Sequence, residues 1–127
     1  MKIALTSVYV HSPEQAFGFY TEVLGFVPRL YMPEAHLAIV ASPEEPEGTA
    51  LLLEPNDNPI AQRYQAELYQ GGFPVIVFGV ADLQGEYERL RARGVVFRGE
   101  PVQGDSGTMV MFEDGCGNLI QLHQPPE

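Results

Sequence analysis

The feature that most constrains the fold of this chain is an internal repeat, because one arrangement of strands and one helix occurs twice. Val10 ends an alternating apolar segment before the first predicted helix, and Val80 stands at the same place before the second. Gly25 and Gly94 follow the two helices, roughly 70 residues apart, where glycine commonly ends a helix. Two copies of one unit predict two similar modules related by a pseudo-twofold axis.

The first module, residues 1–54, is predicted to have the element order β-α-β-β-β. Pro28 makes the second strand an edge strand, since proline has no N–H to donate to a neighbour. Ser12 is expected to cap the helix, with Pro13 in its first turn and Gln15 completing a capping box. From the apolar alternation, strands are expected at residues 3–10, 26–32, 36–41 and 49–54.

The second module, residues 74–123, repeats this order after a connection at residues 55–73. Asp82 is expected to cap its helix. Strands or extended segments are expected at residues 74–80, 95–97, 108–113 and 117–123, and a short helix at residues 60–69. A loop or short strand is expected between residues 100 and 108, around Pro101 and Val102. The predicted fold class is α+β, with residues 1–127 forming a single domain of two β-α-β-β-β modules.

The charge balance and the cysteine content limit the partners and the compartment. The formal net charge is −10 and no basic patch is present, so neither nucleic acid nor an anionic membrane surface is an expected partner. No apolar run approaches the length of a membrane span, and the first residues lack the pattern of a secretory signal. Cys116 is the single cysteine, which excludes an internal disulfide and leads us to expect a cytoplasmic protein.

The last predicted strand carries polar side chains on one of its faces. It follows a turn at Asp114-Gly115, after which Gly117 supplies further backbone freedom. Leu119, Gln121 and His123 then point to one side, and the apolar Ile120 and Leu122 point to the other. An amide and an imidazole on one face of an apolar strand indicate a candidate site, because such groups need partners when they are buried.

The run Asp114-Gly115, followed by Gly117-Asn118-Leu119-Ile120-Gln121-Leu122, resembles the closing segment of the vicinal oxygen chelate superfamily. That superfamily includes glyoxalase I, extradiol dioxygenases, and the fosfomycin and bleomycin resistance proteins. The resemblance covers nearly the whole chain. It implies that each module forms a curved four-stranded sheet with its helix on the convex side, that the concave sides enclose a cleft, and that two chains form a homodimer.

The resemblance also implies where a metal ion would be bound. Its metalloenzymes carry ligands in the first and fourth strands of each module, at positions that correspond here to Leu5, Glu54, Val75 and Gln121. Zn²⁺ or Ni²⁺ needs three or four N, O or S donors. Because two positions are aliphatic and a third is a neutral amide, no cofactor is expected. A divalent metal held by Glu54 and Gln121 is the alternative.

Further polar side chains are predicted to line the cleft. Ser7 and Tyr9 are expected on the same side of the first strand as Leu5, and His36 in the third strand. An exposed histidine or a structural tyrosine is the alternative at these positions. The candidate ligand-binding residues are Glu54, Gln121, His123, Ser7, Tyr9 and His36.

Glu54 ends an apolar strand, so its carboxylate is costly to bury without a partner. The structural alternative to a binding role is a salt bridge with Arg29 or Arg63. No nucleophile or dinucleotide-binding motif accompanies it, and no catalytic residue is predicted.

These observations favour a metal-free protein that binds a small organic molecule. One alternative is a metal-dependent lyase of the glyoxalase type, or a dioxygenase, with an atypical site. A second is a partner or regulatory subunit without catalytic activity.

Overall fold

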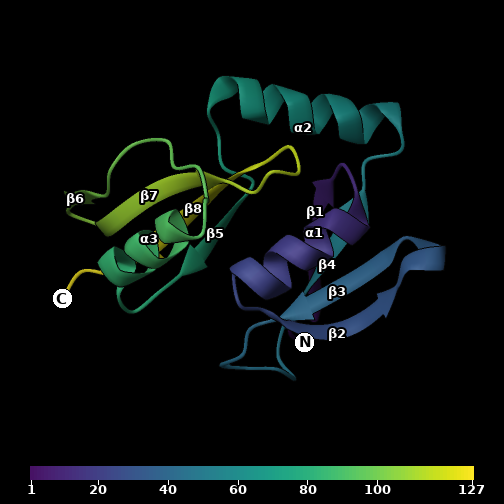
Figure 1. Ribbon diagram of the computed structural model, residues 1–127, viewed down its shortest axis with the longest axis horizontal. Helices are drawn as coiled ribbons and strands as arrows, with labels where there is room; N and C mark the ends of the chain where they lie inside the picture. The colour runs from purple at the N-terminus through teal and green to yellow at the C-terminus, as the bar shows by residue number, and fades with distance from the viewer. The chain divides into compact units, whose positions relative to one another are not determined.

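A computed structural model describes residues 1–127 and confirms the α+β fold with two β-α-β-β-β modules (Figure 1). The chain divides into two compact units, Met1–Gln65 and Ala66–Glu127, so the boundary falls inside the predicted connection. Each unit contains one four-stranded sheet, with strand order β1-β4-β3-β2 in the first and β5-β8-β7-β6 in the second. The same order in both sheets confirms the internal repeat.

Module one is built from β1, α1, β2, β3 and β4. In it β1 and β4 are parallel, whereas β3 is antiparallel to both β2 and β4. The π-helical turn η1 continues α1, and the 3₁₀ turn η2 joins β2 to β3. The bounds are β1 Leu5–Val10, α1 Pro13–Gly18, η1 Phe19–Val23, β2 Val27–Met32, η2 Pro33–Ala35, β3 Leu37–Ala41 and β4 Ala50–Pro55.

The helix of module one covers one face of its sheet. Its start is as predicted, because Ser12 Oγ accepts a hydrogen bond from the Gln15 N–H at 3.2 Å. Gly25, at φ +92°, follows its end. The apolar side chains of this interface are fully or almost fully buried, namely Val8, Val10, Ala16, Tyr20, Val40, Leu51 and Leu53.

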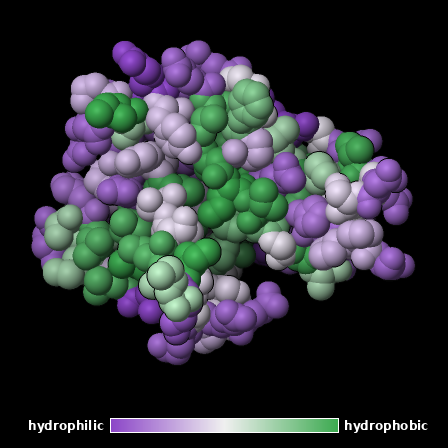
Figure 2. All heavy atoms as spheres, turned by 180° about the vertical axis from the view of Figure 1, so that it is seen from behind, coloured by the Kyte–Doolittle hydropathy of each residue, from purple (hydrophilic) through white to green (hydrophobic).

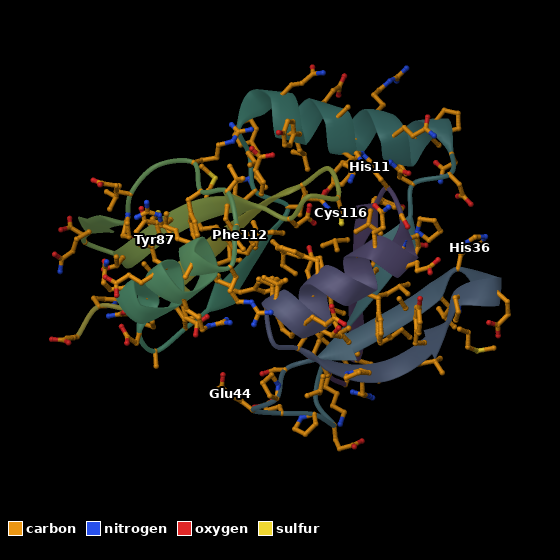
Figure 3. The ribbon with its side chains drawn as sticks, viewed as in Figure 1. His11, His36, Glu44, Tyr87, Phe112 and Cys116 are labelled. Carbon is orange, nitrogen blue, oxygen red and sulfur yellow. The ribbon has the colours of Figure 1, made fainter.

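Module two repeats the arrangement after the helix α2. Its strand β5 is parallel to β8, and β7 is antiparallel to β6 and β8. Tyr87 on α3 packs edge-on against Phe97, with ring centroids 4.7 Å apart, and Phe97 in turn contacts Phe112 of β7 (Figure 3). The bounds are α2 Pro59–Gly71, β5 Ile76–Gly79, α3 Leu83–Ala92, β6 Val102–Gly104, β7 Gly107–Glu113 and β8 Leu119–Gln124.

One predicted element boundary is wrong. His36 does not begin β3, because it has a left-handed backbone at φ 52° and ends the η2 turn, which alternation alone does not reveal. The segment expected to be extended at residues 95–97 forms an isolated bridge between Phe97 and Phe112. The short strand β6 then follows where a loop or short strand was expected.

The helix α2 contacts module one through Gln65 and module two through Tyr69. Gln65 donates from Nε2 to the Tyr9 carbonyl oxygen at 2.9 Å and accepts from Asn56 Nδ2 at 2.7 Å. In module two, the Tyr69 hydroxyl donates to Glu113 Oε1 at 2.7 Å, and Arg98 Nε donates to Glu113 Oε2 at 2.9 Å. The predicted connection is therefore a helix with a side-chain contact in each unit.

The turn before β8 is organised by Asp114, whose side chain is 1% exposed. Its Oδ1 accepts from the Cys116 and Asn118 N–H groups at 2.8 and 3.1 Å, and its Oδ2 accepts from Asn118 Nδ2 at 2.9 Å. Gly115 and Gly117, both at positive φ, complete the turn. The start of β8 depends on this carboxylate because it satisfies three donors.

We expect Asp114→Ala to lower the free energy of unfolding by about 2–4 kcal/mol, because two buried backbone N–H groups lose their acceptor. Urea unfolding measures this. The matched control Asp105→Ala removes an exposed carboxylate and should change the free energy by less than about 0.5 kcal/mol. Equal effects of the two substitutions would contradict the structural role of Asp114.

Glu113 makes part of the stability dependent on pH. The hydrogen bonds from Tyr69 and Arg98 hold the pKa of its carboxyl below the ordinary value of 4.5. A pKa that is lower in the folded state stabilises the protein above the unfolded-state pKa, and this stabilisation is lost as pH falls through the folded-state value. We expect the difference in unfolding free energy between wild type and Glu113→Gln to shrink from about pH 7 to about pH 3.

Glu100→Gln, at an exposed carboxylate without a partner, is the control and should leave the unfolding free energy unchanged. If the difference in unfolding free energy between wild type and Glu113→Gln stays constant with pH, the Glu113 carboxylate does not contribute to the pH dependence of stability.

Candidate functional site

Each sheet has one face that its helix does not cover. Figure 2, which views the molecule from the side opposite to Figure 1, shows hydrophobic side chains at the surface. Among those that remain at least one-third exposed are Leu5, Leu30 and Met32 in module one and Val77 and Val102 in module two. Apolar side chains at the surface of a sheet indicate a contact area for another apolar group.

The strand register defines the open face of module one. Ser7 pairs with Leu52, and Leu52 pairs with Ile39, while Tyr9 pairs with Glu54. Paired residues point to the same side, so the prediction that Leu5, Ser7 and Tyr9 share a face is confirmed. We call this set the open face of module one: Leu5, Ser7, Tyr9, Leu30, Met32, Leu37, Ile39, Leu52 and Glu54.

Glu54 lies half-buried on this face without a hydrogen bond or an ion pair. The structural alternative, a salt bridge with Arg29, does not form, because Arg29 Nη1 donates to the carbonyl oxygens of Pro46 and Gly48 at 3.1 and 3.0 Å. Arg63 forms no ion pair with it either, since both salt bridges of the chain lie in module two. The carboxylate is therefore open to a ligand.

An aromatic pair stands beside Glu54. Tyr9 is its register partner on the neighbouring strand, and the ring of Tyr64 from α2 meets the Tyr9 ring edge-on with centroids 6.2 Å apart. Gln65 fixes this part of α2 by its bond to the Tyr9 carbonyl oxygen. The predicted helix at residues 60–69 includes Tyr64, but helical periodicity alone does not show that this residue meets Tyr9.

The open face of module two carries the other two predicted side chains on β8. Gln121 pairs with Val77 and Met111, and His123 pairs with Gly79 and Met109, so both point to the same side as predicted. His123 Nε2 lies 2.8 Å from the Ser106 carbonyl oxygen. Because a carbonyl oxygen only accepts, Nε2 carries the hydrogen, and Nδ1 of the neutral ring is left as an acceptor.

His36 and Cys116 lie apart from these faces (Figure 3). His36 is exposed in the turn between β2 and β3. Cys116 is buried in the turn before β8, where burial and the nearby Asp114 carboxylate raise the pKa of its thiol to about 12. A thiol that stays protonated near neutral pH is not a nucleophile, so Cys116 packs as a small apolar residue.

The register corrects one feature of the repeat. Strands β4 and β8 have the same pattern of burial, and their parallel partners align Tyr9 with Gly79. Glu54 therefore corresponds to His123, and the counterpart of Gln121 in module one is Leu52. The sequence analysis aligned Glu54 with Gln121 because both are polar residues near the end of a strand. Such a position does not reveal the strand register, so the alignment was shifted by two residues.

This correction changes which residues could bind a metal ion. If Gln121 marks a ligand position in module two, the equivalent in module one is the aliphatic Leu52, and Leu5 and Val75 are aliphatic as well. No group of three or more His, Cys, Asp or Glu side chains comes together in the chain. One amide is too weak a donor set for Zn²⁺ or Ni²⁺, so these residues do not fit a metal centre.

None of the helices combines the length and the apolar character that crossing a membrane requires.

The comparisons with known proteins agree with this fold. The model of the Glyoxalase/Bleomycin resistance protein/Dioxygenase superfamily matches residues 2–122. The uncharacterized protein YurT of Bacillus subtilis (strain 168) is 44% identical over 126 residues, which cover 98% of this chain and 99% of YurT.

Two solved structures are similar over almost the full length. UcmS2 is 30% identical with a TM-score of 0.80, and the match covers 97% of each chain. TnmS3, an antibiotic binding protein from Streptomyces sp. CB03234, is 30% identical with a TM-score of 0.79, and the match covers 99% of this chain and 97% of TnmS3.

Proposed function

The chain belongs to the Glyoxalase/Bleomycin resistance protein/Dioxygenase superfamily, and within it we propose that this protein binds a small organic molecule without a metal ion. The observation that carries the proposal is the open face of module one, which is apolar apart from a few orienting polar groups. Binding sites for organic molecules usually have this composition. The similarity to TnmS3, which is an antibiotic binding protein, supports the same class of ligand.

The donor set distinguishes this proposal from a metal-dependent lyase or dioxygenase. Three of the positions where a metal ligand would stand carry aliphatic side chains, namely Leu5, Leu52 and Val75. Such side chains favour contact with an apolar molecule over coordination of a metal ion. A partner or regulatory subunit without a ligand is the remaining alternative. It predicts that no small molecule stabilises the protein.

We expect members of a panel of aromatic and polycyclic organic compounds to raise the melting temperature. A ligand at about 100 times its Kd that binds only the folded state adds about 2.7 kcal/mol of stability. Leu52→Gln, in the middle of the open face, should reduce the shift. Ile60→Gln makes the same exchange at a side chain that is 83% exposed on α2 and should not. A panel in which no compound changes the melting temperature would favour the regulatory subunit.

We expect Zn²⁺, Ni²⁺ and Fe²⁺ to leave the melting temperature nearly unchanged, because the aliphatic positions supply no ligands. Thermal melting with each ion, together with elemental analysis of the purified protein, checks this. A stoichiometric metal that is lost in Glu54→Ala or Gln121→Ala would contradict the proposal and support the metal-dependent enzyme.

We also propose a homodimer in the cytoplasm. Closed twofold pairs are the commonest soluble homo-oligomers, and the open faces leave apolar surface for a second chain. Light scattering should give about twice the 14.0 kDa mass of one chain at micromolar protein. A mass that stays at one chain as the concentration rises would exclude the dimer.

A further inference from the structure

The unpaired carboxylate of Glu54 restricts the chemistry of the ligand. A carboxylate that is partly removed from water among apolar side chains gains stability from a positively charged or hydrogen-bond-donating partner. Module one supplies none, because Arg29 is bonded to loop carbonyl oxygens and Arg63 forms no ion pair. The partner that this position lacks can come from the ligand.

The side chains around Glu54 favour a cation over a neutral donor. Tyr9 is the register partner of Glu54, the Tyr64 ring meets the Tyr9 ring, and the face of such a ring attracts a cation. A carboxylate next to aromatic rings is an arrangement suited to an ammonium or amidinium group. The other members of the open face of module one are apolar or neutral, so no positive side chain competes with a cation there.

The charge of the whole chain acts in the same direction. The formal net charge is −10, and the acidic side chains of module one have no ion pairs. A field of this sign raises the local concentration of organic cations and lowers that of anions. Long-range attraction and the local contact therefore select the same kind of molecule.

We infer that the ligand of module one is an organic cation with an apolar body, whose positive group lies against the carboxylate of Glu54 and the aromatic pair of Tyr9 and Tyr64. The inference rests on the proposed function and makes it more specific. The apolar body would lie along Leu52 and Ile39, which follow from Glu54 across the same face of the sheet. Glu54 acts here as a specificity-determining residue.

Three acridines of similar size test the charge preference: 9-aminoacridine, a cation near neutral pH, neutral acridine, and anionic acridine-9-carboxylate. Fluorescence titration should give a Kd for 9-aminoacridine about tenfold below that of acridine, and the anion should bind most weakly. Glu54→Gln should raise the Kd of the cation by about tenfold and leave that of acridine unchanged.

Two further variants separate the local contact from overall charge. Glu22→Gln makes the same exchange at an exposed position on the helix of module one and should change the Kd of the cation by less than about twofold. Tyr64→Leu replaces a residue that is 52% exposed and removes an aromatic ring, so it should raise the Kd of the cation by about threefold. Thermal melting of each variant verifies that it is folded.

The outcomes separate this inference from the proposed function. Equal Kd values for 9-aminoacridine and acridine, or equal losses in Glu54→Gln and Glu22→Gln, overturn the cation preference. Failure of all three acridines to bind overturns it as well. After any of these results, a compound from the organic panel that raises the melting temperature would still support the proposed function. The proposed function is overturned only if no compound of the panel raises the melting temperature.

Discussion

The fold depends on the way in which one helix seals one face of each four-stranded sheet. Because side chains alternate along a strand, sealing one face commits every second residue to the core and leaves the rest uncovered. Val10 and Leu53 show the first outcome, since both are fully buried, and Ser7 and Glu54 show the second. A single packing interface thus also determines which side chains are presented to a ligand.

Alternation and turn residues were sufficient to predict the modules, their helices and the sharing of faces. Ser7 and Tyr9 lie on one side, as do Gln121 and His123, because strand periodicity is a local property of the chain. Register is not local, since it depends on the neighbouring strand. This is why the sequence aligned Glu54 with Gln121, whereas strand pairing aligns it with His123.

The same limit applies to contacts between distant segments. Nothing in the spacing of Tyr69, Arg98 and Glu113 indicates that they meet, yet their side chains join α2 to the end of β7. The alternative salt bridge between Glu54 and Arg29 is absent for a similar reason, because the Arg29 guanidinium donates to loop carbonyl oxygens. Side-chain pairing follows from the folded loops, so a candidate binding group is found from sequence more readily than its neighbours.

The repeat also allows the two modules to be compared position by position. At positions facing the helix, both copies remain apolar: Val8 and Phe78, Val10 and Val80, Leu51 and Ile120, Leu53 and Leu122. At three open positions they differ in character, namely Tyr9 and Gly79, Leu52 and Gln121, and Glu54 and His123. One packing scheme thus serves two modules, and the side chains that each module presents on its uncovered face can differ without a change in the core.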